Sequence, residues 1–409
     1  MTKTSLLAGI ATLAVAGAAT FAVTAAAQPR PGGGTVTYWM SADTASGMMA
    51  SSANPAARPS VMGMLGGRGA PRSDAYVKNL RLDLGSPRRA AGAPSADHFV
   101  PAGLNAGPSL PLVSPAPAAP VQRPGPIPQY DPSQVQGRIL IYWGCGERAR
   151  PGQPYEIDLS RLGRGQVPPA FANIPYRPMT PPSAATATTY GEWPNQRSRI
   201  AQIPANGSLV GAHRVAGNYS PEIAFALAPG QDFLPPLTLT SNARGASGAV
   251  PLAWRPVSGA TGYFIMAMGA REDRTMVMWS SSEVQFSQMG LMDYLPPSEA
   301  ARLVQQRVLL PPSATQCTVP AEVAGSVQAA SLMMNAFGPE ANFSHPAPPA
   351  RAPRGWAPEW TVKLRTRSSY MGMLGMDMAA MMRGESQPSQ EEQPRRRRRG
   401  GLLDRVLGQ

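Results

Sequence analysis

Short segments in which apolar and polar residues alternate recur along the chain, and they constrain its fold more than any other feature. Examples are YEIDL at 155–159 and EIAFAL at 222–227, and RILIYWG at 138–144 is strand-like because five of its seven residues are β-branched, aromatic or leucine. They lie between turn residues and lack the apolar spacing of a helix. The 41 Gly and 46 Pro among 409 residues also disfavour long helices. The sequence therefore predicts an all-β protein with sandwich-like domains.

The same alternation predicts further strands along the chain. They cover 35–40, 79–84, 198–203, 208–215, 250–254, 263–269, 275–279, 315–320, 326–344 and 360–368. Residues 41–74 are mainly Gly, Ser, Ala and Met without a pattern and predict a long loop. One short helix is predicted within 296–310, with Ser298 as N-cap and an apolar face of Ala301, Val304 and Val308.

The segment VPLAWRPVSGATGYFIMAMG, residues 250–269, places Trp254 and Tyr263 inward on adjoining strands. It resembles the second and third strands of a fibronectin type III or related immunoglobulin-like module. On this resemblance TQCTVP (315–320) is the fifth strand, 326–344 the sixth, and 360–368 the closing strand. The helix within 296–310 is then an insertion. The resemblance implies a binding or spacing role without chemistry of its own.

These patterns divide the chain into two β-sandwich-like domains with connecting and terminal segments. The expected order is a signal peptide (1–27), a strand and loop segment (28–107), a Pro-rich linker (108–136), a β-rich domain (137–235), the fibronectin type III-like domain (about 236–369) and a disordered Met-rich and Arg-rich tail (370–409).

The N-terminus has the order of a bacterial secretory signal. Lys3 precedes an apolar, uncharged run from Leu6 to Val23, which ends in small residues with a cleavage position near Ala27. A permanent membrane anchor is the alternative, although the run barely reaches spanning length. The sequence therefore predicts a periplasmic or secreted protein.

The net charge of +13 is carried almost wholly by Arg. An Arg-over-Lys bias with much Ala, Pro and Gly also follows from a GC-rich genome, and an exported protein does not meet nucleic acid. A nucleic-acid partner is therefore not expected. An anionic surface of the cell envelope is compatible with this charge.

Cys145 and Cys317 are the two cysteines of the chain. An oxidising compartment permits a disulfide between them, but they are expected in different domains, and two buried free thiols are the simpler interpretation. A catalytic cysteine would need a base, and His98, His213 and His345 all lie far from both in sequence.

Other segments carry reactive side chains without a complete site. In YWGCGE (142–147) the glycines are explained as turn residues, and Glu156 and Asp158 as solvated carboxylates on one strand face. Trp193, Trp356 and Trp360 are the tryptophans proposed for an exposed binding surface, with core packing as the alternative. No catalytic residue is assigned.

Methionine is concentrated in two copies of MGMLG, at 62–66 and 371–375. Thioether sulfur is a soft ligand that suits Cu(I), so a metal site would use Met62, Met64, Met371, Met373, Met376 and Met378. Flexible apolar packing or a docking surface is the preferred interpretation, because Met also fills irregular gaps. No cofactor is predicted.

The C-terminus combines Arg395, Arg396, Arg397, Arg398 and Arg399 with a short amphipathic pattern formed by Leu402, Leu403, Val406 and Leu407. This combination is typical of a peripheral contact with an anionic membrane surface, and a charged, disordered tail is the alternative.

The resulting expectation is a non-catalytic structural or binding protein of the cell envelope. Its partner would be an envelope protein or a polysaccharide, and recognition would use the loop end of one sandwich, because loops on a rigid scaffold carry recognition. Periplasmic copper handling and a carbohydrate-acting enzyme with an accessory module are the alternatives.

Overall fold

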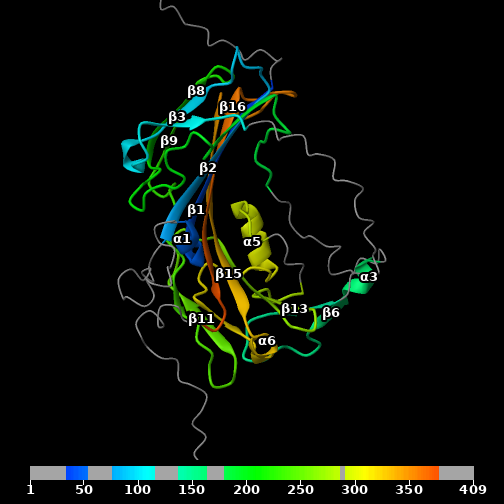
Figure 1. Cartoon of the computed structure of the whole chain (residues 1–409). Coiled ribbons are helices and arrows are strands. Elements are labelled where there is room, and N and C mark those ends of the chain that lie inside the picture. The colour runs from blue at the N-terminus through cyan, green and yellow to red at the C-terminus, as the bar shows by residue number, and fades with distance from the viewer. Residues whose placement is uncertain (1–33, 54–75, 116–136, 164–178, 286–290, 377–409) are drawn as a thin grey trace, which may run out of the picture.

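The computed structural model describes residues 34–53, 76–115, 137–163, 179–285 and 291–376. Strands dominate these residues, as the alternating segments predict, and they form three sheets (Figure 1). The predicted signal peptide, the second half of the Pro-rich linker and most of the tail lie outside the described residues.

The largest sheet has nine strands in the order β6-β5-β13-β12-β15-β16-β1-β2-β7. Their bounds are β1 (Val36–Gly47), β2 (Tyr76–Ser86), β5 (Arg138–Trp143), β6 (Tyr155–Asp158), β7 (Thr189–Trp193), β12 (Gly262–Ala270), β13 (Thr275–Ser280), β15 (Ala330–His345) and β16 (Trp360–Met373). Most neighbours are antiparallel, whereas the pairs β1–β16 and β5–β13 are parallel. The long strands β15 and β16 run through the middle of the molecule and connect its two ends (Figure 1).

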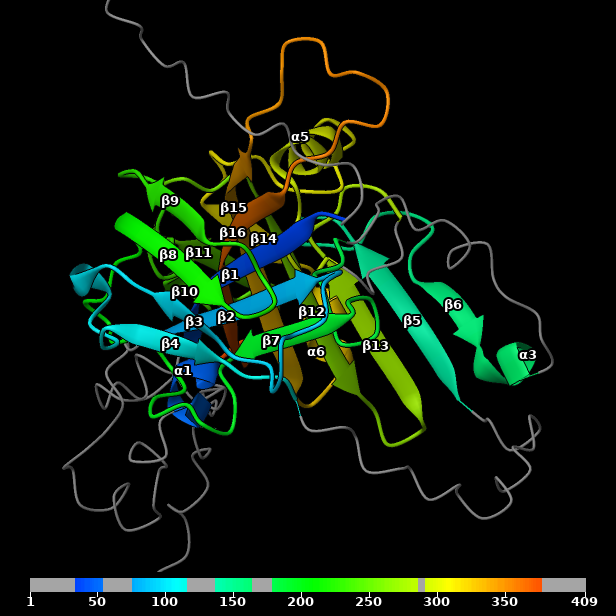
Figure 2. The same cartoon turned by 90° about the horizontal axis from the view of Figure 1, so that it is seen from above.

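Two smaller sheets pack on one face of this large sheet. The four-stranded sheet contains β4 (Ser109–Leu112), β3 (Ala96–Phe99), β8 (Gly211–Gly217) and β9 (Ile223–Leu227) in that order. The three-stranded sheet contains β10 (Leu239–Ser241), β11 (Val250–Trp254) and β14 (Gln316–Val319). Figure 2 shows the four-stranded sheet beside β1 and β2, while β5 and β6 extend from the opposite edge.

Each small sheet encloses its own hydrophobic core. The core under the four-stranded sheet includes Tyr38, Leu82 and Trp193, whereas the core under the three-stranded sheet includes Trp254 and Tyr263. The Trp254 and Tyr263 rings lie 5.4 Å apart, so this pair packs inward on neighbouring layers, as the sequence predicts. Burial of such large apolar side chains makes the main favourable contribution to the folding free energy of a β-sandwich.

The segment between β9 and β10 crosses from one core to the other along β1. Thr44 Oγ1 donates a hydrogen bond to the carbonyl of Leu234 at 2.7 Å, and Ser46 Oγ donates to the carbonyl of Leu237 at 2.6 Å. These bonds satisfy backbone carbonyls that would otherwise be buried without a partner. The two cores therefore lie side by side on one continuous sheet.

Helices in the described residues are short. They are α1 (Met48–Ala53), the 3-10 helix η2 (Ala102–Leu104), α3 (Leu159–Gly163), α5 (Pro297–Gln305) and α6 (Ala321–Ser326). The predicted helix within 296–310 is confirmed as α5, but Ser298 is not its N-cap. Pro297 occupies the first helical position and leaves Ser298 inside the helix, since the fixed φ of proline suits that position. Ala300 and Leu303 are buried, Val308 is buried after the helix, and Val304 packs against the same cluster, so of the predicted face only Ala301 is exposed.

Most predicted strands exist, and the errors have local causes. Residues 198–203 form no strand, because Ile203 makes only an isolated bridge to Lys78. Part of the predicted loop at 41–74 is strand, since β1 continues to Gly47 between β2 and β16. Part of the segment predicted as a Pro-rich linker (108–136) is strand, because β4 occupies Ser109–Leu112 with Pro111 inside it.

Strands from 34–115 and from 137–235 join the same large sheet as strands from 236–369. β5 pairs with β13, and the whole of β1 pairs with β16. Whether the predicted segments 28–107, 137–235 and 236–369 fold as independent domains stays a prediction.

A disulfide joins Cys145 to Cys317, with the two Cα atoms 5.2 Å apart. Cys317 lies on β14, and Cys145 lies in the turn after β5. The interpretation of both cysteines as free thiols is wrong. The residues are close because β14 packs over the large sheet near the end of β5, a relationship that their separation of 172 residues conceals.

Candidate functional site

The face of the large sheet that points away from both small sheets is here called the outer face. Side chains alternate between the two sides of a strand, so even-numbered residues of β1 and β16 fill the cores and odd-numbered ones lie on the outer face. The outer-face side chains of β16 from 363 to 369 are polar, whereas those at 371 and 373 are methionines. Helix α5 lies on this side, opposite β3, β8 and β9 (Figure 1).

One row of outer-face residues crosses five strands from β7 to β15. Register places Glu192 opposite Asp83, Asp83 opposite Trp39, Trp39 opposite Lys363, and Lys363 opposite Asn342. Trp39, Glu192 and Lys363 are half-buried, and Asn342 is exposed. The row thus places the half-buried ring of Trp39 between two carboxylates, the fully buried Asp83 and the half-buried Glu192, on one side and an ammonium and an amide on the other.

A closed polar network holds the β2–β7 end of this row. Arg81 Nε lies 3.0 Å from Asp83 Oδ1, and Arg81 Nη2 lies 2.9 Å from Glu192 Oε2. The Tyr190 hydroxyl donates to Asp83 Oδ1 at 2.6 Å and lies 2.9 Å from Glu192 Oε2. Burial raises the pKa of Asp83, while Tyr190 and Arg81 oppose that rise. The network fixes two carboxylates side by side, with Arg81 covering them at 51 % exposure of its side chain.

Lys363 and Arg365 approach the ring of Trp39 from β16. Lys363 Nζ lies 5.6 Å and the Arg365 guanidinium carbon 5.1 Å from the ring centroid. Lys363 also pairs with Glu340, with Nζ 2.7 Å from Oε2. Cations at this distance from an indole interact with its quadrupole and limit its movement. Trp39 is therefore held in place from one side while part of its surface stays accessible.

A second polar group lies further along β1 and β16. Arg367 Nη2 lies 3.2 Å from Asp43 Oδ2, and Ser369 Oγ donates to Asp43 Oδ1 at 2.9 Å. Tyr294, from the segment before α5, covers this group with its ring 4.3 Å from the Arg365 guanidinium and 4.7 Å from that of Arg367. Burial lowers the pKa of Arg365 and raises that of Tyr294.

Sequence reasoning missed the outer face as a site. The residues of β16 read K-L-R-T-R from Lys363 to Arg367, which places three cations on one face of a strand. That alternation is visible in the sequence. Its partners on β1 and β2 lie about three hundred residues away, so their register could not be read from local pattern.

The tryptophans proposed for an exposed surface lie elsewhere. Trp193 is 1 % exposed and Trp360 7 % exposed, so both belong to the core under the four-stranded sheet, which is the alternative of core packing. Trp193 ends β7 with its side chain inward rather than standing in an open turn. Trp356 is half-buried in the connection between β15 and β16.

The second MGMLG copy is largely strand rather than tail. Met371 and Met373 lie at the end of β16 on the outer face, half-buried, and Met376 is exposed. Met371 stands opposite Met333 of β15, which stands opposite Met266 of β12. Met62, Met64 and Met378 lie outside the described residues. The methionine row continues the packing beneath α5, which favours the apolar interpretation.

The remaining predicted positions show ordinary surroundings. Glu156 and Asp158 are exposed on the edge strand β6, and Glu156 lies 3.5 Å from Arg138. Arg395, Arg396, Arg397, Arg398 and Arg399 lie outside the described residues. Among the described residues, no three His, Cys, Asp or Glu side chains are grouped so that they could hold a metal ion.

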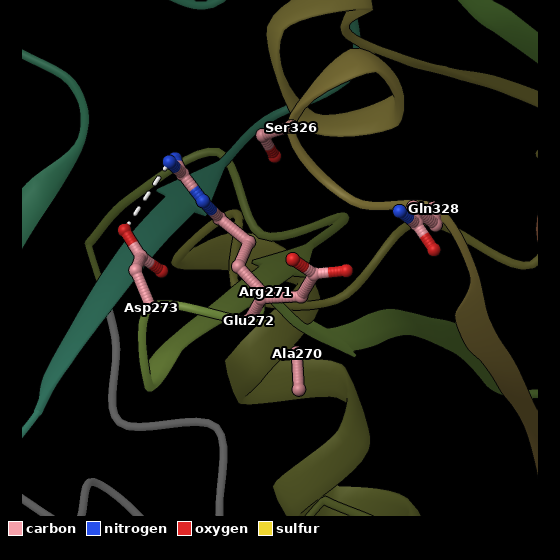
Figure 3. A pocket seen from close by; sticks show the side chains of 6 residues that line it. All are labelled: Ala270, Arg271, Glu272, Asp273, Ser326 and Gln328. Carbon is pink, nitrogen blue, oxygen red and sulfur yellow. Dashed lines mark ion pairs between the residues drawn. The ribbon is translucent and has the colours of Figure 1, made fainter.

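A pocket of about 330 Å³ lies at the β12–β13 turn (Figure 3). Its lining includes Arg271 and Asp273, which are ion-paired at 3.3 Å, and Ser326 and Gln328 from the opposite side. Asp273 is also paired with Arg138 at 3.3 Å. These side chains are engaged in surface ion pairs and turn contacts, so the pocket lacks a set of converging reactive groups.

No protein-family model, curated protein or solved structure matches this chain. Among the described helices, none combines the length and apolarity required to span a membrane.

Proposed function

We propose that this protein is an exported, non-catalytic component of the cell envelope that binds a polysaccharide on its outer face. The observation that carries this proposal is the row Glu192–Asp83–Trp39–Lys363–Asn342. An indole ring offers a flat apolar surface to the C–H face of a sugar ring. The carboxylate of Glu192, the ammonium of Lys363 and the amide of Asn342 supply accessible acceptors and donors for the hydroxyl groups.

Rigidity of the row supports a binding role. All five positions belong to strands, and the two carboxylates are fixed by Arg81 and Tyr190. A preorganised surface loses little conformational entropy when a ligand binds. The salt bridges that occupy both carboxylates favour recognition over acid–base catalysis, because a general acid must exchange its proton with the substrate.

Export is supported by the N-terminal signal pattern and by the disulfide. Disulfides persist in oxidising compartments and are rare where glutathione keeps thiols reduced. The bond between Cys145 and Cys317 therefore agrees with a periplasmic or secreted location. Polysaccharides are abundant ligands in both places.

A fibronectin type III-like module in residues 236–369 is also proposed. The strand assigned as second, β11, pairs with the assigned fifth, β14, and the assigned third, β12, pairs with the assigned sixth, β15. Immunoglobulin-like sandwiches use these pairings. In this chain β5 extends one edge of the module, and β1, β2 and β7 continue beyond its closing strand β16.

The proposal is tested by binding of the purified mature protein to envelope polysaccharides, using Trp39→Ala as the variant. Trp143→Ala is the matched control, because Trp143 is a half-buried tryptophan of the same sheet separated from β1 by four strands. Because Trp39→Ala removes the ring on which a sugar would stack, we expect about 10-fold weaker polysaccharide binding, equivalent to roughly 1.4 kcal/mol. Equal effects of the two substitutions, or no polysaccharide binding by the native protein, would contradict it.

A further inference from the structure

Arg365 is a buried guanidinium without an ion-pair partner among the described residues. It is 5 % exposed, and no carboxylate of the described residues lies within 4.0 Å of it. Its Nε donates to Ser41 Oγ at 2.7 Å, and its Nη1 is buried without any hydrogen-bond partner. Removing a charge from water without a partner costs several kcal/mol, so an unpaired buried cation requires a reason.

Other cations of the outer face are neutralised locally. Arg81 is paired with Asp83 and Glu192, Lys363 with Glu340, and Arg367 with Asp43. Arg365 stands between the last two on β16 and donates a hydrogen bond from Nε to Ser41 Oγ, while Asp293 and Asp83 act on it electrostatically without forming an ion pair. Among these four cations, Arg365 is the one without a carboxylate at ion-pair distance in the described residues.

The surroundings of Arg365 point to a ligand that both accepts and donates hydrogen bonds. Asp83 Oδ2, Glu340 Oε1 and Arg367 Nε are also buried without a partner in this part of the outer face. Glu340 stands directly opposite Arg365 in the register of β15 and β16. A carboxylate of a ligand can accept from a guanidinium, while hydroxyl groups on the same ligand can donate to the partly exposed carboxylate of Glu192 in the neighbouring row.

Aromatic rings position the guanidinium next to the proposed sugar surface. The Arg365 guanidinium carbon lies 5.1 Å from the ring centroid of Trp39 and 4.3 Å from that of Tyr294. Arginine accepts such ring contacts through its planar faces and leaves its N–H edge free for an anion. A sugar ring stacked on Trp39 would therefore carry its substituents toward Arg365.

We propose that the polysaccharide bound on the outer face is acidic, and that a carboxylate of its sugar units pairs with Arg365. This inference rests on the proposed polysaccharide-binding function and names the class of ligand. The formal charge of +13 favours association with a polyanion in general, so the specific role of Arg365 must be separated from overall attraction.

The test compares two probes with the same backbone, polygalacturonate and its methyl ester, by titration at fixed salt. The native protein should bind polygalacturonate at least tenfold more tightly. Arg365→Gln should weaken polygalacturonate binding about 10- to 100-fold, as expected for one charge-assisted contact, and leave the affinity for the ester within about twofold. A sulfated glycan is the third probe, and carboxylate recognition predicts that Arg365→Gln changes its affinity much less.

Arg255→Gln is the matched control, because Arg255 is exposed at the end of the three-stranded sheet and the charge change is identical. It should affect all three probes by less than twofold. Ser41→Ala provides a second variant if Arg365→Gln fails to fold, since it removes only the bond to Nε and should weaken polygalacturonate binding severalfold. Melting temperatures confirm that each variant is folded.

Three results would overturn the inference. Equal affinity of the native protein for acid and ester would do so while leaving the proposed function intact. Equal losses for Arg365→Gln and Arg255→Gln would assign the effect to net charge. Absence of binding to every glycan tested would remove the proposed function together with the inference.

Discussion

The Cys145–Cys317 disulfide joins the turn after β5 to β14, and thereby links the large sheet to the three-stranded sheet that packs on it. The hydrogen bond from Gly146 N to the Thr318 carbonyl, 2.9 Å, lies beside it. The chain closed by this bond spans 172 residues and includes the connection between both cores.

Loss of this disulfide should lower stability. Replacing both cysteines by alanine is expected to reduce the free energy of unfolding by about 2–5 kcal/mol, because the unfolded chain regains the freedom of a long loop. Urea unfolding followed by circular dichroism measures the change, and the native protein with and without reductant provides the comparison. Unchanged unfolding midpoints would show that the bond does not constrain the fold.

Buried histidines should make stability depend on pH. The Tyr38 hydroxyl, His98 and His213 form a chain in the core under the four-stranded sheet, with 2.8 Å from Tyr38 Oη to His98 Nδ1 and 2.9 Å from His98 Nε2 to His213 Nδ1. Burial lowers the pKa of both histidines below the ordinary value of 6.5. The folded protein therefore keeps both rings neutral at a pH where the unfolded chain takes up protons.

The sign follows from this difference in proton binding. The free energy of unfolding should be highest above about pH 6.5. It should fall as the pH drops toward 5, by up to roughly 1.4 kcal/mol per pH unit for each histidine. Urea midpoints measured from pH 5 to 8 give the slope. The double variant His98→Gln/His213→Gln should lose most of this pH dependence. An equally steep slope in that variant would contradict the role of the two histidines.

Methionine oxidation should follow burial on the outer face. Met276 and Met376 are each 39 % exposed, whereas Met266 and Met278 are each 6 % exposed beneath α5. Limited peroxide treatment followed by peptide mass spectrometry should modify the exposed pair well before the buried pair, because oxidation requires access to the sulfur. Equal rates would mean that α5 does not cover this part of the sheet.

The sequence pattern alone predicts the strands in which apolar and polar residues, or buried and exposed positions, alternate strongly. In β9, Ile223, Phe225 and Leu227 are buried and Ala224 and Ala226 exposed, as alternation predicts. Such strands can be recognised because each has one face on a core and the other in solvent.

Strands that are buried on both faces could not be recognised from the sequence pattern. The second half of β1, from Ser41 to Gly47, consists of small and polar residues and is nevertheless largely buried. Pairing on both edges satisfies its backbone, and partners such as Ser369 and Arg367 satisfy its side chains. These partners are supplied by strands distant in sequence, so only tertiary structure explains the segment.

The candidate site was partly predictable. Trp39 lies in the predicted strand at 35–40, and the charged alternation of β16 is visible from Lys363 onward. The sequence drew attention instead to Trp193, which is one residue from Glu192 but points to the other side of β7. Which face of a strand meets a core depends on the opposing sheet, and that information is not local.

A structure of the protein with a bound acidic oligosaccharide would test the central claim most directly. We expect a sugar ring stacked on Trp39, with a carboxylate within hydrogen-bond distance of the Arg365 guanidinium and hydroxyl groups near Glu192 or Lys363. Binding at another surface, with the outer face of β1, β2 and β16 unoccupied, would contradict the account.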